Sequence, residues 1–336
     1  FFCVFGLVVL LAAAGAAYNT IEQHQDARRF PQQGKSVSLG PEFGNAALNI
    51  DCSGQGSPSV VLESGGGVPA IGWKFVQPQI AGFTRVCSYD RAGYGWSTPG
   101  PMPRTSEQIA RELHALLAAA GEKPPYILVG HSLGGFNIRV FNKDYAGEVA
   151  GMVLVDASHE DQVSRMPPSL AASAKPSAAA ARTQLILTRL LIDFGIARLS
   201  SGPPRPAYLT QDFADELRYL QLQGKFISAI GSELASFDTS ADQTRASGTL
   251  GNKPLIVLTA GKVPDVKTLP PNFPAKDFAD FQTNVWQNDL QVREAHLSGR
   301  GRQIIVPDSD HMIPFERPDT IVSAVREVWS AAGGKQ

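Results

Sequence analysis

Short apolar runs recur along the chain, each bounded by Gly, Pro or Asp, and they predict eight β-strands. From the third run onward they are dense in Val, Ile and Leu, and helical patterns such as residues 106–121 separate most of them. Strands of a parallel sheet that is covered by helices on both faces have this continuous apolar character. The first two runs predict an antiparallel edge. The eight runs occupy residues 35–40, 47–52, 59–64, 84–90, 126–130, 150–156, 254–261 and 302–308.

One long interval interrupts this alternation of strands and helices. Residues 157–250 separate the sixth run from the seventh and are rich in Ala, Leu and Pro. Helical periodicity at residues 182–199 and 210–234 predicts helices here. Because a structureless loop of this length is uncommon inside a compact domain, the pattern predicts a helical cap, or lid, over one end of the sheet. The Ala-rich stretch 170–182 is alternatively a mobile connector.

The chain begins with an apolar segment. Residues 1–17 carry no charge and end in small residues that resemble a signal-peptidase site near Ala17. The segment is apolar on every face, which fits a core-packed amphipathic helix poorly. Two interpretations stay open: a cleaved export signal, or a helix that anchors the protein in a membrane and so keeps it associated with that membrane. Residues 18–35 are polar and predict a tether. The protein is therefore expected to be exported, to the periplasm or outside the cell, or membrane-anchored.

Charge and size narrow the classes of partner. Thirty Lys and Arg stand against 31 Asp and Glu, so the net charge of −1 provides no broad field for nucleic acid or another polyanion. A small, largely uncharged substrate is expected instead. With 336 residues and 43% hydrophobic content, the chain can bury a large α/β core.

The three cysteines leave one candidate disulfide. Cys3 lies in the apolar N-terminal segment, so Cys52 and Cys87 are the only pair in the portion that would be exported. An oxidising compartment permits a disulfide between them, and free buried thiols are the alternative.

A serine stands between two glycines in GHSLG, residues 130–134, where an apolar run ends and a helical pattern begins. A tight turn from strand to helix holds Ser132 in a strained backbone conformation, and glycines at its flanks let the two elements approach without Cβ clashes. The hydroxyl is then raised above the sheet edge. The Leu133 amide, at the start of the helix, can stabilise a negative charge on an attacked carbonyl oxygen.

This motif is the Gly-x-Ser-x-Gly nucleophile elbow, and the chain from Gly40 to its C-terminus resembles the α/β-hydrolase family. The resemblance implies an α/β fold: a mostly parallel eight-stranded sheet with helices on both faces and a helical cap inserted after strand 6. Residues 36–156 and 251–336 are then the hydrolase core, and residues 157–250 are the cap. Ser132 is the implied nucleophile.

A serine hydroxyl is a weak nucleophile at neutral pH and needs a base within hydrogen-bond reach. His311 follows the last apolar run, and together with Glu316 and Pro318 it resembles the histidine loop of the family. His311 is therefore the predicted general base. The family more often has Gly just before this histidine, where this chain has Asp310, a remote candidate for the third group. His131, beside the serine, is expected to point elsewhere.

A carboxylate must hold the tautomer of the imidazole and stabilise the imidazolium that forms. The family places it after the sixth or the seventh strand, and both positions are occupied here. Asp156 ends the sixth apolar run, and Asp265 follows the seventh by a few residues. The later position is commoner in the family, but Asp265 lies in a long Pro-rich loop, whereas Asp156 stands at a well-defined strand end. Asp156 is preferred as the triad acid, with Asp265 as the alternative.

The family completes the oxyanion hole with an amide from the loop after the third strand. Here Ser64 stands where the family commonly has His, and Gly65 matches the family's glycine. The Gly66 amide is then the expected second donor, beside Leu133. Three consecutive glycines allow close approach of the backbone to a ligand.

Two further features follow from the resemblance. The family's sheet places its second and fourth strands side by side, which favours a disulfide between Cys52 and Cys87 over free thiols. The turn at residues 90–97 is similar to a turn of the family, and Asp90 and Arg91 are expected to brace the loops around the site.

These residues predict a serine hydrolase that cleaves carboxylic esters of hydrophobic small molecules through an acyl-enzyme intermediate. Amide or carbon–carbon bond hydrolysis would use the same triad, and a non-catalytic ligand-binding protein is the alternative from another class. Ser132 argues against dehalogenases and epoxide hydrolases, which have Asp at the elbow. Asp156, His159, Glu160 and Asp161 cluster without the paired His or Cys spacing of a metal site, so neither metal nor cofactor is expected.

Overall fold

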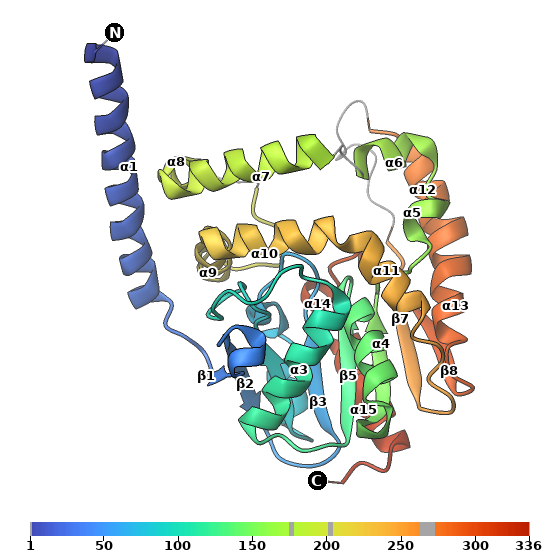
Figure 1. Cartoon of the computed structure of the whole chain (residues 1–336). Helices are drawn as coiled ribbons and strands as arrows, with labels where there is room; N and C mark the ends of the chain where they lie inside the picture. The colour runs from blue at the N-terminus through green and yellow to red at the C-terminus, as the bar shows by residue number, and fades with distance from the viewer. Residues whose placement is uncertain (1, 175–177, 201–203, 263–272, 336) are drawn as a thin grey trace.

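The computed structural model describes residues 2–174, 178–200, 204–262 and 273–335. Within them the strands form one eight-stranded sheet in the order β1-β2-β4-β3-β5-β6-β7-β8 (Figure 1). β2 is antiparallel to both β1 and β4, and the other neighbours are parallel, which confirms the predicted fold class and its antiparallel edge. The strands are β1 (Lys35–Ser38), β2 (Ala47–Ser53), β3 (Ser59–Glu63), β4 (Val86–Tyr89), β5 (Tyr126–His131), β6 (Val149–Val155), β7 (Leu255–Ala260) and β8 (Gly301–Val306).

Helices cover both faces of the sheet, as Figure 1 shows. On one face, α3 (Ser106–Ala120) and α4 (Gly134–Asp144) share a core with strand residues such as Val61. On the other face, α2 (Gln77–Ala81) and α15 (Pro318–Ala331) share a second core with strand residues such as Val60. Because successive strand residues point to opposite faces and both faces of the central strands are buried, runs such as residues 126–129 and 152–155 are apolar at every position.

The interval between β6 and β7 folds into a set of helices, named here the inserted helices. They are α5 (Gln162–Arg165), α6 (Pro168–Ala174), α7 (Ala178–Asp193), α8 (Ile196–Leu199), α9 (Gln211–Gln221), α10 (Gly224–Ala235) and α11 (Phe237–Arg245). α10 lies against the loops that follow β3 and β4: a Cβ built on Gly93 would lie 2.6 Å from the Ala229 Cβ, and one on Gly67 would lie 3.8 Å from the Ile230 side chain. α10 therefore sits at the carboxyl ends of these strands.

The chain after β7 returns through helices to β8 and the final helix α15. These segments are α12 (Ala275–Asp280), the π-helix η5 (Phe281–Leu290), α13 (Gln291–Ala295) and, after β8, α14 (Ile313–Glu316). Short 3-10 turns are η1 (Pro41–Phe43), η2 (Ala70–Trp73) and η3 (Ala146–Glu148). π-helical segments are rare in proteins, and those that occur often lie at functional sites.

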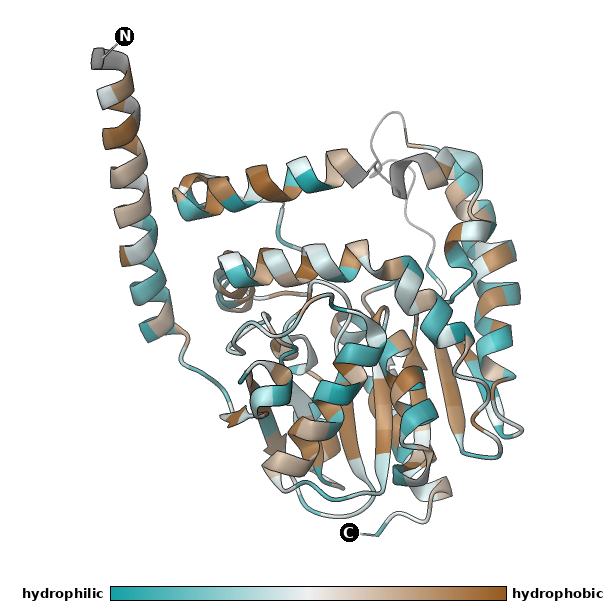
Figure 2. Ribbon diagram, viewed as in Figure 1, coloured by the Kyte–Doolittle hydropathy of each residue, from teal (hydrophilic) through white to brown (hydrophobic). Residues whose placement is uncertain are grey.

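The N-terminal segment is one helix, α1 (Phe2–Arg29), that continues through most of the polar stretch predicted to be a tether. The difference has a tertiary cause, because polar side chains of α1 bind the inserted helices. Arg198 of α8 donates to Asn19 Oδ1 at 2.9 Å and pairs with Asp26 at 2.7 Å. By length and composition α1 is able to cross a membrane, and Figure 2 shows its apolar N-terminal part.

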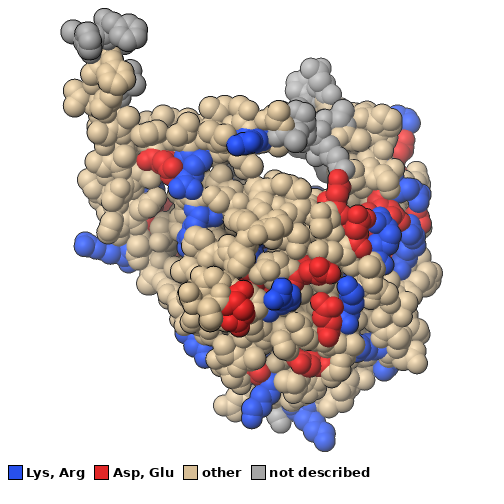
Figure 3. Space-filling model, in the orientation of Figure 1, with Lys and Arg blue, Asp and Glu red and all other residues tan. Residues whose placement is uncertain are grey.

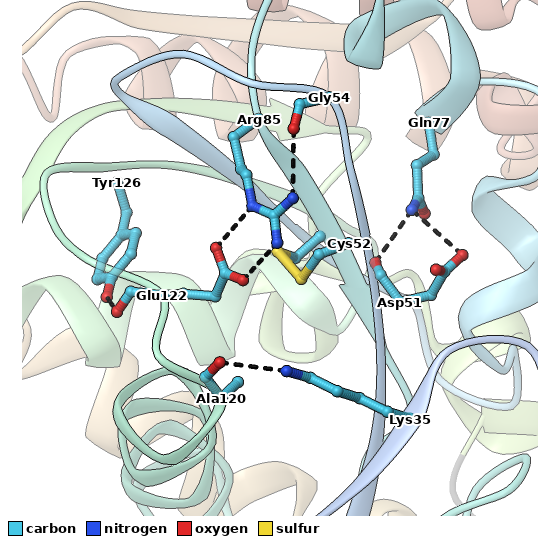
Figure 4. Close-up of a disulfide and its surroundings, with 10 residues drawn as sticks. Lys35, Asp51, Cys52, Gly54, Gln77, Arg85, Ala120, Glu122 and Tyr126 are labelled. Atoms are coloured by element: carbon cyan, nitrogen blue, oxygen red, sulfur yellow. Dashed lines mark hydrogen bonds and ion pairs between the residues drawn. A yellow bond between two sulfur atoms is a disulfide. The ribbon is translucent and has the colours of Figure 1, made fainter.

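Cys52 of β2 lies directly opposite Cys87 of β4, and a disulfide joins them (Figure 4). Beside it, Arg85 donates two hydrogen bonds to the Glu122 carboxylate, at 2.9 and 2.7 Å. The disulfide ties the antiparallel edge to the parallel part of the sheet.

Candidate active site

Ser132 stands at the turn between β5 and α4, with a left-handed φ of 53° that is uncommon for a residue with a side chain. Its amide donates to the Val155 carbonyl at 3.1 Å, which ties the turn to β6. A Cβ on Gly130 would lie 2.7 Å from the Gly134 carbonyl oxygen, and one on Gly134 would lie 2.5 Å from the Glu63 carbonyl oxygen. The two flanking glycines are thus required by close backbone approach.

His311 lies in the loop between β8 and α14, against this turn. His131, the residue before Ser132, donates from Nε2 to the His311 carbonyl oxygen at 2.8 Å, and the centroids of the two rings are 4.8 Å apart. The two histidines are 180 positions apart in the sequence. The fold therefore brings the loop of the predicted base against the turn that holds the predicted nucleophile, and the bond from His131 ties the two together.

Asp156 reaches the same place from the end of β6. Its Oδ2 accepts a hydrogen bond from His311 Nδ1 at 2.6 Å, and its Oδ1 accepts from the Ala260 amide at 2.9 Å and from the Trp286 indole at 2.8 Å. The Asp156 side chain is 3% exposed, whereas that of His311 is 48% exposed. The carboxylate is thus enclosed and the imidazole is accessible to a substrate. Asp265 lies outside the described residues.

Electrostatics favour an ionised Asp156. Burial would raise its pKa, but the hydrogen bond from His311 and the charge of His311, with the bonds from Trp286 and Ala260, hold the pKa below its usual value. For His311, burial would lower the pKa, but the hydrogen bond to Asp156 and its charge raise it above the usual value. Burial and the neighbouring His311 lower the pKa of His131 to about 3, so His131 is neutral.

The glycine loop after β3 packs against the serine turn. A Cβ built on Gly65 would lie 3.1 Å from the Ser132 Cβ, and one on Gly66 would lie 3.6 Å from Leu133 Cδ2. Gly66 and Leu133, the residues predicted to supply the oxyanion donors, are therefore neighbours.

Arg91 holds this glycine loop in place from the end of β4. Its guanidinium donates to the carbonyl oxygens of Ser64 at 2.6 Å and Gly65 at 2.9 Å, and it pairs with Glu63 at 2.7 Å. Its Nε also pairs with Glu233 of α10 at 2.8 Å. The three charged side chains are at most 2% exposed, so each depends on the others for compensation of its charge.

Tyr94 adds a second link between the same loop and α10. Its hydroxyl donates to Glu233 Oε2 at 2.7 Å and accepts from the Gly67 amide at 3.1 Å. Glu233 therefore binds both side chains that position the loop. The bracing role expected for Arg91 agrees with its contacts. Glu233 was not expected, because a Glu on an amphipathic helix ordinarily faces water.

The acidic side chains that follow β6 form ion pairs with arginines. Glu160 pairs with Arg139 at 2.6 Å, and Asp161 pairs with Arg293 at 2.8 Å. Among the described residues, the ligand atoms of Cys52, Cys87 and Glu122 lie close enough together to hold a metal ion. The two sulfurs form the disulfide and supply no thiolate.

Two cavities differ in their relation to the triad. One of about 400 Å³ lies at the antiparallel edge, and no triad residue lines it. Its lining includes Asn49, Asp51, Lys74, Gln77, Ser88 and Trp96. Another, of about 10 Å³, borders Gly65, His131 and Phe315 beside the serine turn. Of the two, only the small one borders the candidate site.

The sequence of the chain matches a family model and several individual proteins. The model of the alpha/beta hydrolase family matches residues 60–324. "Uncharacterized protein YqjL" of Bacillus subtilis (strain 168) is 26% identical over 281 residues, which are 83% of this chain and 86% of that protein. "Probable transporter efuK" of Hormonema carpetanum is 37% identical over 116 residues, which are 33% of this chain and only 17% of that protein.

Solved structures share the fold. The structure of a thermophilic esterase from Thermogutta terrifontis, with malate bound, aligns with a TM-score of 0.59 at 19% identity and covers 89% of this chain and 99% of that chain. Similarity at this level of identity establishes the common fold.

The hydrogen bond between Asp156 and His311 predicts a pH titration. We expect NMR to show that the His311 imidazole has a pKa above that of a free histidine, and that Asp156→Asn lowers it, because burial is then opposed only by the weaker effect of the Asp310 charge. His131 should remain neutral until the pH approaches its pKa of about 3. A His311 pKa that is the same in both proteins would contradict the pairing.

Proposed function

The chain belongs to the alpha/beta hydrolase family, and we propose that it is a serine hydrolase that cleaves carboxylic esters of hydrophobic small molecules through an acyl-enzyme intermediate. The observation that carries the proposal is the 2.6 Å hydrogen bond between His311 Nδ1 and Asp156 Oδ2, beside the Ser132 turn. A ligand-binding protein without turnover would not need an enclosed carboxylate that orients an imidazole next to a strained serine.

Ser132 is the proposed nucleophile and His311 the proposed general base. Because Nδ1 donates to Asp156, the neutral imidazole carries its proton there and presents Nε2 as the acceptor. The Ser132 oxygen bonds to the substrate carbonyl carbon while its proton passes to Nε2. Asp156 stabilises the imidazolium and does not take the proton.

The substrate carbonyl oxygen becomes an oxyanion in this step. The amides of Gly66 and Leu133 are the proposed donors, and their closeness supports this role. His311 then returns its proton to the departing alkoxide, which leaves as the alcohol. A water molecule repeats the sequence on the acyl-enzyme and releases the acid, which regenerates Ser132.

Glu233 is proposed to position the oxyanion donors without touching the substrate. It binds Arg91, which holds the carbonyls of residues 64 and 65, and Tyr94, which holds the amide of Gly67. A donor that is displaced by a fraction of its hydrogen-bond length stabilises the oxyanion less.

We also propose that residues 157–250 are a cap over the active site and that they supply apolar contacts to the substrate. The side chain of Ile230 in α10 approaches the glycine loop, and a Cβ on Gly66 would lie 3.9 Å from it. Leu133 and Phe136 of the elbow region form an apolar cluster with Ala241 of α11. These contacts favour a hydrophobic acyl or alcohol group.

The same triad would also hydrolyse an amide or a carbon–carbon bond. Esters are proposed first because their alcohol leaving group departs more easily than an amine or a carbanion. A panel that includes an anilide beside the matching ester separates these reactions.

The first kinetic prediction concerns the triad. With p-nitrophenyl esters of graded acyl length, we expect Ser132→Ala and Asp156→Asn each to lower kcat by about a thousand-fold or more. In the Asp156→Asn protein the amide oxygen of the new side chain would accept the bonds from Trp286 and Ala260, so its NH₂ group would face His311 and favour the wrong tautomer.

Asp265→Asn is the matched control for this experiment, and it should keep the wild-type rate. Unchanged hydrolysis by Ser132→Ala would reject the nucleophile. A loss in Asp265→Asn with normal activity in Asp156→Asn would transfer the role of the acid to Asp265.

The second kinetic prediction concerns Glu233. We expect Glu233→Gln to lower kcat for the same esters by roughly 10- to 100-fold with a small effect on KM, because the glycine loop loses its position. Glu216→Gln is the matched control, since Glu216 is also a buried Glu of the inserted helices and binds Gln33 and Lys74 instead. An equal loss of kcat in both variants would show a general structural effect and refute the positioning role.

A further inference from the structure

An apolar surface on α7 and α8 faces solvent. It consists of six side chains that are 44–76% exposed: Ile186, Leu187, Leu190, Leu191, Ile196 and Leu199. We call these six residues the α7–α8 surface. The opposite side of α7 packs on α10, where a Cβ on Gly231 would lie 2.7 Å from the Leu185 side chain. Contiguous exposed apolar surface of this kind marks a binding surface.

The same surface can be followed in two views of the molecule. Figure 2 shows apolar residues along α7 and α8, on the outer side of the inserted helices. In the space-filling view of Figure 3 the same edge of the molecule is mostly uncharged.

α1 packs directly against the junction of α7 and α8. A Cβ on Gly15 would collide with the Phe194 carbonyl oxygen, and one on Gly195 would lie 2.9 Å from the Gly15 carbonyl oxygen. The two helices therefore meet backbone to backbone. The polar contacts of Arg198 with Asn19 and Asp26 lie on the C-terminal side of this crossing.

On the N-terminal side of the crossing, α1 is apolar and projects beyond α7 and α8 (Figure 1). Residues 2–14 extend about 20 Å at the helical rise of about 1.5 Å per residue. Among its side chains that the structure describes, five large apolar ones are at least half exposed: Phe5, Leu7, Val9, Leu10 and Leu11. α1 thus changes from apolar to polar at the level of the α7–α8 junction.

A bilayer that receives the apolar part of α1 would therefore meet α7 and α8 at its surface. The charges are compatible with this placement, because the one Asp of residues 178–199, Asp193, is neutralised by its pair with Arg189 at 2.7 Å. Arg198 is paired with Asp26 of α1, and the stem of an arginine such as Arg189 suits the headgroup region, where it contacts apolar groups.

We propose that the α7–α8 surface docks on the lipid bilayer that α1 enters, so that its six apolar side chains lie in the headgroup and upper acyl region. The docked face belongs to the inserted helices, and α10 lies between α7 and the glycine loop of the candidate active site. The docking itself does not depend on the proposed hydrolysis.

The test places an environment-sensitive nitrobenzoxadiazole (NBD) label on single cysteines of the full chain. Cys3→Ser provides the background, because Cys52 and Cys87 are joined in the disulfide. Labels are placed at Leu187→Cys and Leu199→Cys on the surface, and at Leu7→Cys on α1 as the membrane reference. Ser330→Cys, which is exposed on α15 at the opposite end of the molecule, is the matched control.

The labelled proteins are reconstituted in vesicles of phosphatidylcholine and phosphatidylglycerol. We expect NBD emission at positions 7, 187 and 199 to move to shorter wavelength and to be quenched by lipids with a spin label on the acyl chain, whereas position 330 shows neither effect. Quenching at position 7 without quenching at 187 and 199 would overturn the docking surface. If the label at position 7 is not quenched, α1 does not enter the bilayer, and the docking proposal fails with it.

A second copy of the chain is the competing occupant of this surface. A blue shift at 187 and 199 that grows with protein concentration and resists the spin-labelled lipids would identify that occupant and contradict docking on the bilayer.

Discussion

The hydrogen bond between Asp156 and His311 is the interaction on which the candidate site depends. Its two residues come from the ends of β6 and β8, and the intervening β7 supplies the Ala260 amide that holds the other carboxylate oxygen. Trp286, from the π-helix η5, binds the same oxygen. Neighbouring parallel strands that end at one edge of the sheet are therefore what makes a short contact between distant parts of the chain feasible.

A second, fully enclosed set of charges complements this pair. Arg91 pairs with both Glu63 and Glu233 and donates to the carbonyls of the glycine loop, so that the loop which would hold an oxyanion is tied to a helix of the insertion. Leaving any one of these charges unpaired would lower the stability of the folded state, because each charge is removed from water. The arrangement joins the position of α10 to the geometry beside Ser132.

Local patterns in the sequence are sufficient for the strands and the serine turn, because glycine spacing and apolar runs reflect backbone geometry that acts within a few residues. The histidine loop follows from the resemblance to the family. The preference for Asp156 over Asp265 rests on its position at a defined strand end, whereas the contact itself depends on which carboxylate the fold brings to His311. Trp286 and Glu233 carry no local signal in the sequence, because their roles depend on the same long-range packing. The helical conformation of residues 18–29 differs from the predicted tether because it is stabilised by partners such as Arg198, far along the chain.

The central claim is that His311, oriented by Asp156, activates Ser132. Its most direct measurement is the reaction of the protein with a fluorophosphonate, followed by peptide mass spectrometry. The account predicts a single phosphonylated residue, Ser132, and loss of labelling when His311→Gln removes the base while the protein stays folded. Labelling of another residue, or equal labelling of the His311→Gln protein, would contradict it.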